Sequence, residues 1–210
     1  MALDYKKKYR EFYLPGTEPQ IAEVPEMNAA AVRGKGDPNA ENGAYQAAIS
    51  LLYSISYAVK TGPKNGLEIP GYFDYVVPPL ESFWQAPKEA AGEEIRKEEF
   101  QWISLIRLPE FADEEIFVRA AELVAEKKKL DVSQAEFLIV REGLCVQCMH
   151  IGSFDRERET VEKMDRYLKK QGYVNDFGSG RMHHEIYLSH IRRVPPERWK
   201  TVIRHPVKRG

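Results

Sequence analysis

The chain has 210 residues, of which 43% are hydrophobic and 11% aromatic, so it has enough apolar surface for a packed core and is not wholly disordered. Its 31 Lys and Arg residues balance 32 Asp and Glu residues, and a net charge of -1 excludes the global field that would attract nucleic acid. No apolar run reaches the about 18 residues of a membrane span, and two cysteines are too few for a disulfide framework. We therefore expect a cytoplasmic protein with neither nucleic acid nor membrane as partner.

The N-terminal part predicts an arm followed by a strand. Residues 1–24 carry a Lys-rich start and a Pro/Gly stretch, and we expect them to form an N-terminal arm or short helix. The segment MNAAAVRGKG, from Met27 to Gly36, is apolar and ends on glycines, which is typical of a strand that runs into a loop.

A helix is predicted next. Asn39 or Asn42 can cap its start, and Gly62 and Pro63 should stop it. Its apolar residues recur at three- and four-residue spacing: Tyr45, Ala48, Ile49, Leu52, Ile55 and Val59.

Extended structure should follow. Residues 72–85, YFDYVVPPLESFWQ, indicate a strand interrupted at Pro78 and Pro79, and the polar residues 86–98 indicate a turn or excursion. The segment FQWISLIRLP, residues 100–109, predicts another strand.

A second helix is predicted after Asp113, which can cap it. Its first turn is acidic, with Glu114 and Glu115, and its end is basic, so both ends match the helix dipole.

The second half repeats this plan. Residues 136–140 and 143–152 predict two strands around a turn, residues 160–170 a helix, and HHEIYLSHI, residues 183–191, a closing strand.

The predicted fold class is therefore α+β, with two pseudo-symmetric strand-helix-strand-strand repeats. Repeat one covers about 25–130 and repeat two about 131–208 of a single domain, 25–208, in which Gly36 corresponds to Gly152. We expect an antiparallel sheet with helices on one face and a ligand groove between the repeats.

The first candidate site lies on the closing strand. Alternate side chains of a strand share a face, so Glu185 projects with Tyr187, whereas His184 and Ile186 face the other way. A carboxylate on a half-buried strand would be more basic, and a phenol beside it could hold a ligand or a water. The alternative is a solvated strand face with two ordinary polar residues.

Aromatic residues of the first half could form the walls of a pocket. The segment WISLIRLPEF resembles YLSHIRRVPPERW, which places Trp102 on the strand equivalent to that of Glu185, and a pseudo-twofold axis would bring the two faces together. Trp84, Phe83 and Tyr75 are the further candidates for stacking against a flat ligand. The alternative is that these rings fill the core.

Other motifs are excluded on geometry. HEIYL lacks the second histidine of a zinc protease, so we expect no metal. Cys145 and Cys148 would turn to opposite faces of a strand, which predicts two buried thiols. The basic C-terminal segment, residues 192–210, could attract an anion, but we expect a solvated tail with Trp199 packed on the core.

Four segments carry a resemblance to a known family: MNAAAVRGKGDPN, GYFDYVVPPLESFWQ, FQWISLIRLPEF and HHEIYLSHIRRVPPERWKTVIRHPV. In this order they resemble the GyrI-like (gyrase-inhibitor-like) small-molecule-binding proteins over most of the chain. The resemblance implies two strand-helix-strand-strand units and a groove for flat, hydrophobic or cationic compounds, with Glu185 as its central acidic residue.

A standalone subset of that family is similar in Glu185, Tyr187 and Trp102 to cyclopropanoid cyclopropyl hydrolases, which open the strained ring of DNA-alkylating compounds with water. The resemblance implies that Glu185 deprotonates a water, Tyr187 hydrogen-bonds the water or the carboxylate, and Trp102 stacks on the substrate, with no metal or organic cofactor. A non-catalytic binder or sensor of drugs and a gyrase-interacting module are the alternatives. A monomer is favoured, but the sequence does not decide the oligomeric state.

Overall fold

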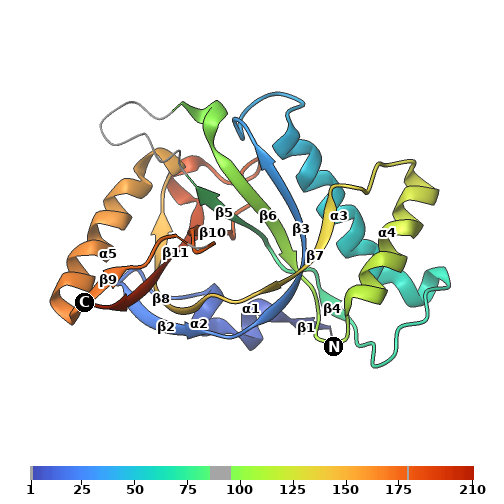
Figure 1. The fold of residues 1–210 in the computed structure, drawn as a ribbon, viewed down its shortest axis with the longest axis horizontal. Helices are drawn as coiled ribbons and strands as arrows, with labels where there is room; N and C mark the ends of the chain where they lie inside the picture. The colour runs from blue at the N-terminus through green and yellow to red at the C-terminus, as the bar shows by residue number, and fades with distance from the viewer. Residues whose placement is uncertain (1, 86–95, 179) are drawn as a thin grey trace. The chain divides into compact units, whose positions relative to one another are not determined.

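A computed structural model describes residues 2–85, 96–178 and 180–210, so most of the polar stretch expected as an excursion, residues 86–98, lies outside the described residues. The chain forms two compact units. Unit 1 comprises Met1–Tyr5 and Met27–Val140, and unit 2 comprises Lys6–Glu26 and Arg141–Gly210. Figure 1 labels their elements.

Unit 1 has a four-stranded antiparallel sheet in the order β5-β6-β3-β7, together with two long helices. A two-residue parallel pair, β1 with β4, lies outside this sheet. The bounds are β1 Leu3–Asp4, β3 Met27–Lys35, α3 Ala44–Thr61, β4 Tyr75–Val76, β5 Leu80–Gln85, β6 Gln101–Arg107, α4 Glu114–Lys128 and β7 Ala135–Val140. Two short 3-10 turns, Gly62–Asn65 and Lys97–Glu99, complete the unit.

The core of unit 1 lies between one face of its sheet and the helices α3 and α4. Alternate residues of the strands, such as Ala30 and Val32 on β3 and Trp102 and Ile106 on β6, are buried in one cluster with the apolar faces of both helices. The predicted strand from Met27 and the predicted helix are confirmed.

The capping of α3 differs from the prediction. The helix begins after Gly43, and neither Asn39 nor Asn42 caps it. Asn39 instead donates its backbone N–H to Asp37 Oδ1, at 2.8 Å, in the preceding turn. The side-chain hydrogen bond in this stretch is therefore accepted by Asp37 in a turn before the helix, and no asparagine side chain caps the helix. The predicted stop at Gly62 is confirmed.

Helix α4 agrees with its prediction at both ends. Asp113 Oδ1 accepts the backbone N–H of Ile116 at 3.0 Å, and Glu114 and Glu115 occupy the first turn. Lysines fill the last turn, where the helix dipole favours cations.

Unit 2 has antiparallel strands in the order β2-β8-β11-β10, with β9 paired to the C-terminal end of β11. The bounds are α1 Tyr5–Lys8, α2 Arg10–Tyr13, β2 Gln20–Val24, β8 Gly143–Ile151, α5 Glu157–Gln171, β9 Tyr173–Asn175, β10 His183–Tyr187 and β11 Lys200–Arg209. Single 3-10 turns, Phe154–Arg156 and Pro196–Arg198, precede α5 and β11.

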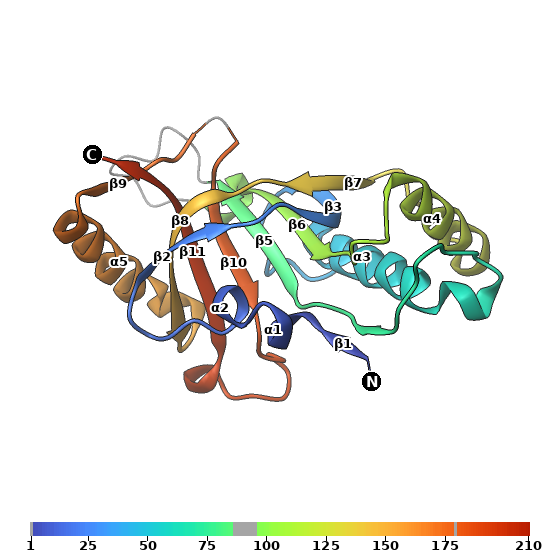
Figure 2. The same ribbon diagram turned by 90° about the horizontal axis from the view of Figure 1, so that it is seen from below.

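Both faces of the unit 2 sheet are covered. Helix α5 packs on the face that carries Cys148 and Ile203, and α2 packs on the face that carries Cys145 and Val202. Figure 2 shows the two helices on opposite sides of β8 and β11. The prediction that the two cysteines are buried thiols on opposite faces is confirmed.

The C-terminal segment is a solvated tail only in part. Residues 192–198 are almost all exposed, but Lys200–Arg209 forms β11, which lies between β8 and β10, and its residues from Thr201 to Val207 are buried. The prediction was wrong because Pro206 and the charged residues argue against an inner strand. The N-terminal arm, in turn, ends in β2, which pairs with β8.

The two units share one internal topology. In unit 1 the order β3, α3, β5, β6 gives the sheet β5-β6-β3, and in unit 2 the order β8, α5, β10, β11 gives β10-β11-β8. Gly36 and Gly152 end the first strand of each set, both with positive φ, as the predicted correspondence requires. Strand β10, which carries Glu185, is therefore equivalent to β5 and not to the Trp102 strand β6, which corrects the sequence alignment. No helix among the described residues is long and apolar enough to cross a membrane.

Candidate functional site

The candidate site is built on one face of β10. The strand alternates between buried and partly buried residues, so that His183, Glu185 and Tyr187 share one face and the buried His184 and Ile186 face the other way. The side chain of Glu185 is 12% exposed, and that of His183 is 23% exposed. The predicted common face of Glu185 and Tyr187 is present, and solvent still reaches the carboxylate.

Histidine 183 holds the Glu185 carboxylate from its own strand. Its Nε2 lies 2.9 Å from Glu185 Oε1, and its Nδ1 lies 2.7 Å from Nε2 of His205 on β11. His205 is buried against the ring of Phe177, with ring centroids 4.9 Å apart. Burial, followed by the neighbouring His183, lowers the pKa of His205 to about 3, so this imidazole is neutral at physiological pH.

A second carboxyl group reaches the site from the first residue of α5. Glu157 is partly buried, and one of its carboxyl oxygens lies within 4.8 Å of the ligand atoms of His183 and Glu185. Burial is the largest cause that raises the pKa of Glu157 well above its usual range, and the charge of Glu185, its hydrogen bond and Asp155 add to it. Two carboxyl groups so close cannot both ionise without cost, which is why the pKa of Glu157 is raised.

The same three side chains are close enough to hold a metal ion. One ligand atom each from Glu157, His183 and Glu185 lies within 4.8 Å of the others. Carboxylates with an imidazole are donors that suit Zn²⁺, Mn²⁺ or Fe²⁺. Binding of a cation would, however, require ionised Glu157 and would replace the hydrogen bond between His183 and Glu185.

Aromatic rings border the site beside Tyr187. Phe154, just before α5, packs edge-on against Tyr187 with ring centroids 5.8 Å apart and lies 4.9 Å from the Trp199 ring. Trp199 Nε1 donates to the backbone oxygen of Val194 at 2.7 Å. This cluster orients the Tyr187 phenol on the face of Glu185.

The opposite face of the same strands holds a buried charge network. Glu142 accepts from Arg204 at 2.5 Å and pairs with His184 Nδ1 at 2.9 Å. Burial opposes the charge of Glu142, but Arg204 and His184 outweigh it and lower its pKa to about 2. Arg204 also donates to Gln147 and to the backbone oxygen of Phe12, so the network ties α2 to the sheet.

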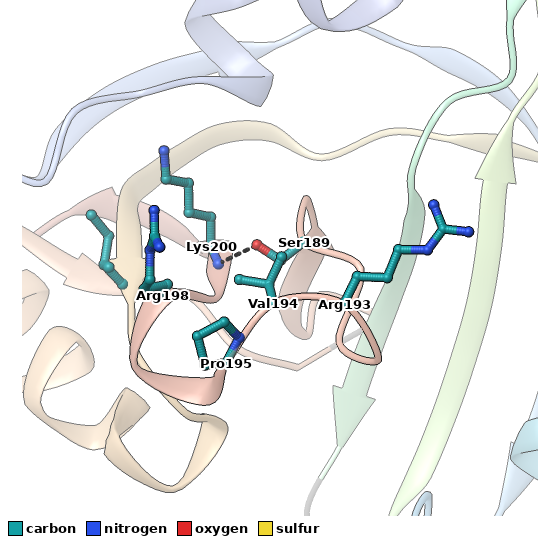
Figure 3. A pocket seen from close by; sticks show the side chains of 7 residues that line it. Ser189, Arg193, Val194, Pro195, Arg198 and Lys200 are labelled. Atoms are coloured by element: carbon teal, nitrogen blue, oxygen red, sulfur yellow. Dashed lines mark hydrogen bonds between the residues drawn. The ribbon is translucent and has the colours of Figure 1, made fainter.

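A pocket of about 470 Å³ opens beyond the end of β10. Figure 3 shows the Arg198 and Lys200 side chains close together, whereas the Arg193 side chain extends away from them, and the backbone N–H of Lys200 donates to Ser189 Oγ. The lining residues are Ile151, Ser189, Arg193, Val194, Pro195, Arg198 and Lys200. Glu185 and Tyr187 are not among them, so the chemistry-bearing cluster and this basic pocket are separate features of unit 2.

The aromatic residues predicted as pocket walls all lie in unit 1. Trp84 pairs with Trp102 across β5 and β6, and both rings contact Tyr45, at 5.3 and 5.1 Å between centroids. Trp102 is 2% exposed, whereas Trp84 is only partly buried. Phe83 is adjacent to Trp84 in the sequence and therefore lies on the other face of β5.

Tyr75 lies apart from these three rings. It is fully buried on β4, its hydroxyl donates to the backbone oxygen of Ser56 at 3.3 Å, and its ring packs edge-on against Tyr5.

Three residues of the site were missed from the sequence. His183 stands two residues before Glu185, so the strand alternation already contained that signal. Glu157 is one of several acidic residues at helix starts, and nothing in the sequence distinguishes it. His205 was missed because its strand was taken for a tail.

The fold and the site thus define a duplicated α+β protein with an ionisable cluster that is partly open to solvent. The family model described as "GyrI-like small molecule binding domain" matches residues 17–208, and the chain belongs to the GyrI-like family.

Solved structures agree with this assignment. The chain is 40% identical to a hydrolase from Listeria innocua, with a TM-score of 0.89 over 98% of this chain and 100% of that one. An uncharacterized conserved protein from Listeria innocua is also 40% identical, with a TM-score of 0.90 over 98% and 100% of the two chains. The C-terminal domain of EcmrR, at 13% identity and a TM-score of 0.55 over 92% and 98%, shows the shared fold alone. No curated protein matches the chain significantly.

Proposed function

We propose that this protein binds flat hydrophobic small molecules and hydrolyses the cyclopropane ring of cyclopropanoid DNA-alkylating toxins in the cytoplasm. The observation that carries the proposal is Glu185, a carboxylate that is 12% exposed, held by His183 and accompanied by Tyr187 on the same face. The family match supports small-molecule binding, and the Listeria innocua protein described as a hydrolase supports hydrolysis. The free thiols of Cys145 and Cys148 fit a reducing compartment.

The reaction adds one water to the substrate. Glu185 accepts a proton from the water, and the water oxygen bonds to a ring carbon. The cyclopropane C–C bond breaks, its electron pair moves into the conjugated dienone, and the resulting phenolate takes up the proton. Tyr187 hydrogen-bonds the water or the carboxylate. General-base assistance contributes about 10²- to 10⁴-fold, which suffices because ring strain and aromatisation drive the step.

Substrate stacking by Trp102 and Trp84 is part of the proposal, and Phe83 and Tyr75 would support these rings through packing. Trp84 has the more exposed ring of the first two, so it is the better residue to test. A Trp84→Leu substitution should raise KM more than it lowers kcat, because stacking acts on the bound substrate before and during the reaction.

The deciding experiment incubates the purified protein with a spirocyclopropyl dienone alkylator and follows the product by mass spectrometry. The wild type should add one water catalytically, Glu185→Gln should lose about 10²- to 10⁴-fold, and Tyr187→Phe should lose less. Glu159→Gln is the matched control, since that exposed carboxylate of α5 pairs with Arg156 at the surface. If all proteins behave alike, the role of Glu185 is refuted.

A non-catalytic binder is the second candidate, favoured by the family description as a small-molecule-binding domain. Glu185 would then serve as countercharge for a cationic drug. The same assay separates the two functions, because a binder would retain the compound unchanged and would bind it more weakly in Glu185→Gln.

A further inference from the structure

The segment that connects β10 to β11 carries more positive than negative charge. Residues 189–200 include three arginines and one lysine but a single acidic residue, Glu197. Three of the four cations, Arg193, Arg198 and Lys200, line the pocket beyond the end of β10, and Glu197 does not. In the described part of the chain, none of these three cations forms an ion pair. The pocket therefore has a positive charge that is not neutralised by an ion pair within the described chain.

Hydrogen bonds hold this segment in place at both ends and in its middle. At the ends, the backbone N–H of Leu188 donates to the backbone oxygen of Lys200 at 3.0 Å, and the N–H of Lys200 donates to Ser189 Oγ at 2.9 Å. In the middle, the Trp199 ring donates to the backbone oxygen of Val194 at 2.7 Å. A pocket that is already formed loses less conformational entropy when a ligand binds.

The rest of the pocket is mainly apolar. Ile151, at the end of β8, is 49% exposed and pairs with Lys200 in the register of β8 and β11. Val194 and Pro195 complete the apolar part. The volume of about 470 Å³ lies within the range of roughly 300–1,000 Å³ that is typical of small-molecule sites. An exposed aliphatic side chain beside unpaired cations suits a ligand that has both an apolar body and an anionic group.

The cations are not spread evenly over the pocket. Arg198 and Lys200 lie close together, whereas Arg193 extends away from them (Figure 3). Like charges repel each other, and an anion bound between them removes that repulsion. Guanidinium and ammonium groups both donate charge-assisted hydrogen bonds to carboxylate, sulfonate or phosphate oxygens. Ser189 Oγ accepts from Lys200, so its hydroxyl proton is available to donate to a ligand.

We propose that this pocket is a second small-molecule site, which binds an organic anion. The carboxylate, sulfonate or phosphate group of the ligand lies against Arg198 and Lys200, and its apolar body lies on the aliphatic side chains beside them. The site shares no residue with the Glu185 cluster and has the opposite charge preference, so it goes beyond the proposed hydrolysis of cyclopropanes.

The first test compares three probes of similar shape and different charge by isothermal titration calorimetry. A naphthalenesulfonate should bind to one site on the protein, and its affinity should fall as NaCl is added, because salt screens exposed charges. The neutral naphthalenemethanol and the cationic naphthylmethylamine should bind at least about 10-fold more weakly, because they lose the charge-assisted hydrogen bonds. If the neutral alcohol binds as tightly as the sulfonate, the pocket is merely apolar and the inference is overturned.

The second test places the anion by substitution. Arg198→Gln and Lys200→Gln should each weaken the binding of the naphthalenesulfonate by about 10-fold, whereas Arg193→Gln should weaken it by less than about 3-fold. Lys169→Gln, which removes an exposed lysine from the last turn of α5, is the matched control and should bind like the wild type. All four side chains are exposed, so these variants should fold as the wild type does.

Three outcomes overturn the inference. Equal affinities in all four variants would mean that the sulfonate binds elsewhere. Tighter binding by Glu185→Gln would place the anion beside that carboxylate, whereas an unchanged affinity is expected because Glu185 does not line the pocket. Tighter binding of a polyglutamate peptide than of the sulfonate would make the segment a surface for acidic proteins. Calorimetry needs no turnover, so a failure of the proposed hydrolysis leaves this result unaffected.

Discussion

The two units place different chemistry at equivalent positions of one topology. When Gly36 is matched to Gly152, the strand registers align Ser82 with Glu185 and Trp84 with Tyr187. The start of the helix contributes in both. The hydroxyl of Tyr45, the second residue of α3, lies 2.9 Å from Ser82 Oγ, whereas a carboxyl oxygen of Glu157, the first residue of α5, lies within 4.8 Å of Glu185.

The neighbouring positions differ in the same sense. Trp102 corresponds to Thr201, and Gly34 corresponds to His150. In unit 1 the Trp102 ring packs over Gly34, and the hydroxyl groups of Tyr45 and Ser82 pair with each other. In unit 2 the equivalent strand carries ionisable side chains that are partly open to solvent. A duplicated topology thus carries aromatic side chains and hydroxyl groups in one copy and ionisable side chains at the equivalent positions of the other.

The largest expected effect concerns charge burial, because the ion pair of Glu142 with Arg204 in unit 2 is buried, whereas the pair of Glu136 with Arg33 in unit 1 is exposed. Glu142→Gln leaves Arg204 without its carboxylate and should lower the free energy of unfolding by about 3–5 kcal/mol. Glu136→Gln in unit 1, where the pair with Arg33 is 41% and 55% exposed, should cost about 0–1 kcal/mol. Urea denaturation at pH 7 measures both, and equal costs would contradict the comparison.

The same network predicts that the free energy of unfolding falls at acid pH. The pKa of Glu142 is lowered from 4.5 to about 2, so its contribution to stability is complete above pH 4.5 and is lost as the pH falls toward 2. Glu142→Gln should remove this dependence. If the free energy of unfolding of the wild type is constant from pH 4.5 to 2.5, protonation of Glu142 does not affect stability and the prediction is wrong.

The second effect concerns the glycine of unit 1. A Cβ on Gly34 would lie 2.2 Å from the Trp102 ring, so Gly34→Ala should cost about 1–3 kcal/mol by overpacking. Trp102→Phe should recover part of that cost in the double variant, because a smaller ring leaves room for the methyl group. A double-mutant cycle from urea denaturation measures the coupling, and strictly additive costs would mean that the two residues do not compete for space.

The sequence predicted most elements of the two units but not their pairing. The helices α3 and α4 followed from apolar spacing, and α4 also from its Asp113 cap. The inner strand β11 was missed because Pro206 and Arg204 resemble exposed residues, although Arg204 is in fact paired with Glu142 inside the unit. Local pattern cannot report a partner 62 residues away.

The candidate site was predictable in the same uneven way. Glu185 and Tyr187 followed from the two-residue period of one strand and from the family resemblance. Glu157 and His205 lie on other elements, so their approach to His183 depends on tertiary packing. Trp102 was matched to the wrong strand because sequence similarity between the halves shifted the alignment by one strand.

The smallest expected effect concerns the two contacts between a helix start and a strand, Tyr45 with Ser82 and Glu157 with Glu185, whose contributions to stability should depend differently on pH. Tyr45→Phe removes a hydroxyl group that lies 2.9 Å from Ser82 Oγ and should cost about 0.5–1.5 kcal/mol at every pH from 4.5 to 8.5, because the contact joins two hydroxyl groups and involves no carboxyl group. Glu157 has a raised pKa, so the wild type binds its proton more tightly when folded, and stability is lost as the pH rises above the unfolded value of 4.5. Glu157→Gln should therefore match the wild type near pH 4.5 and become progressively more stable than it toward pH 8.5, as measured by urea denaturation. A constant difference would mean that Glu157 ionises as readily in the folded protein as in the unfolded chain, and unit 2 would then tolerate two charges where unit 1 keeps none.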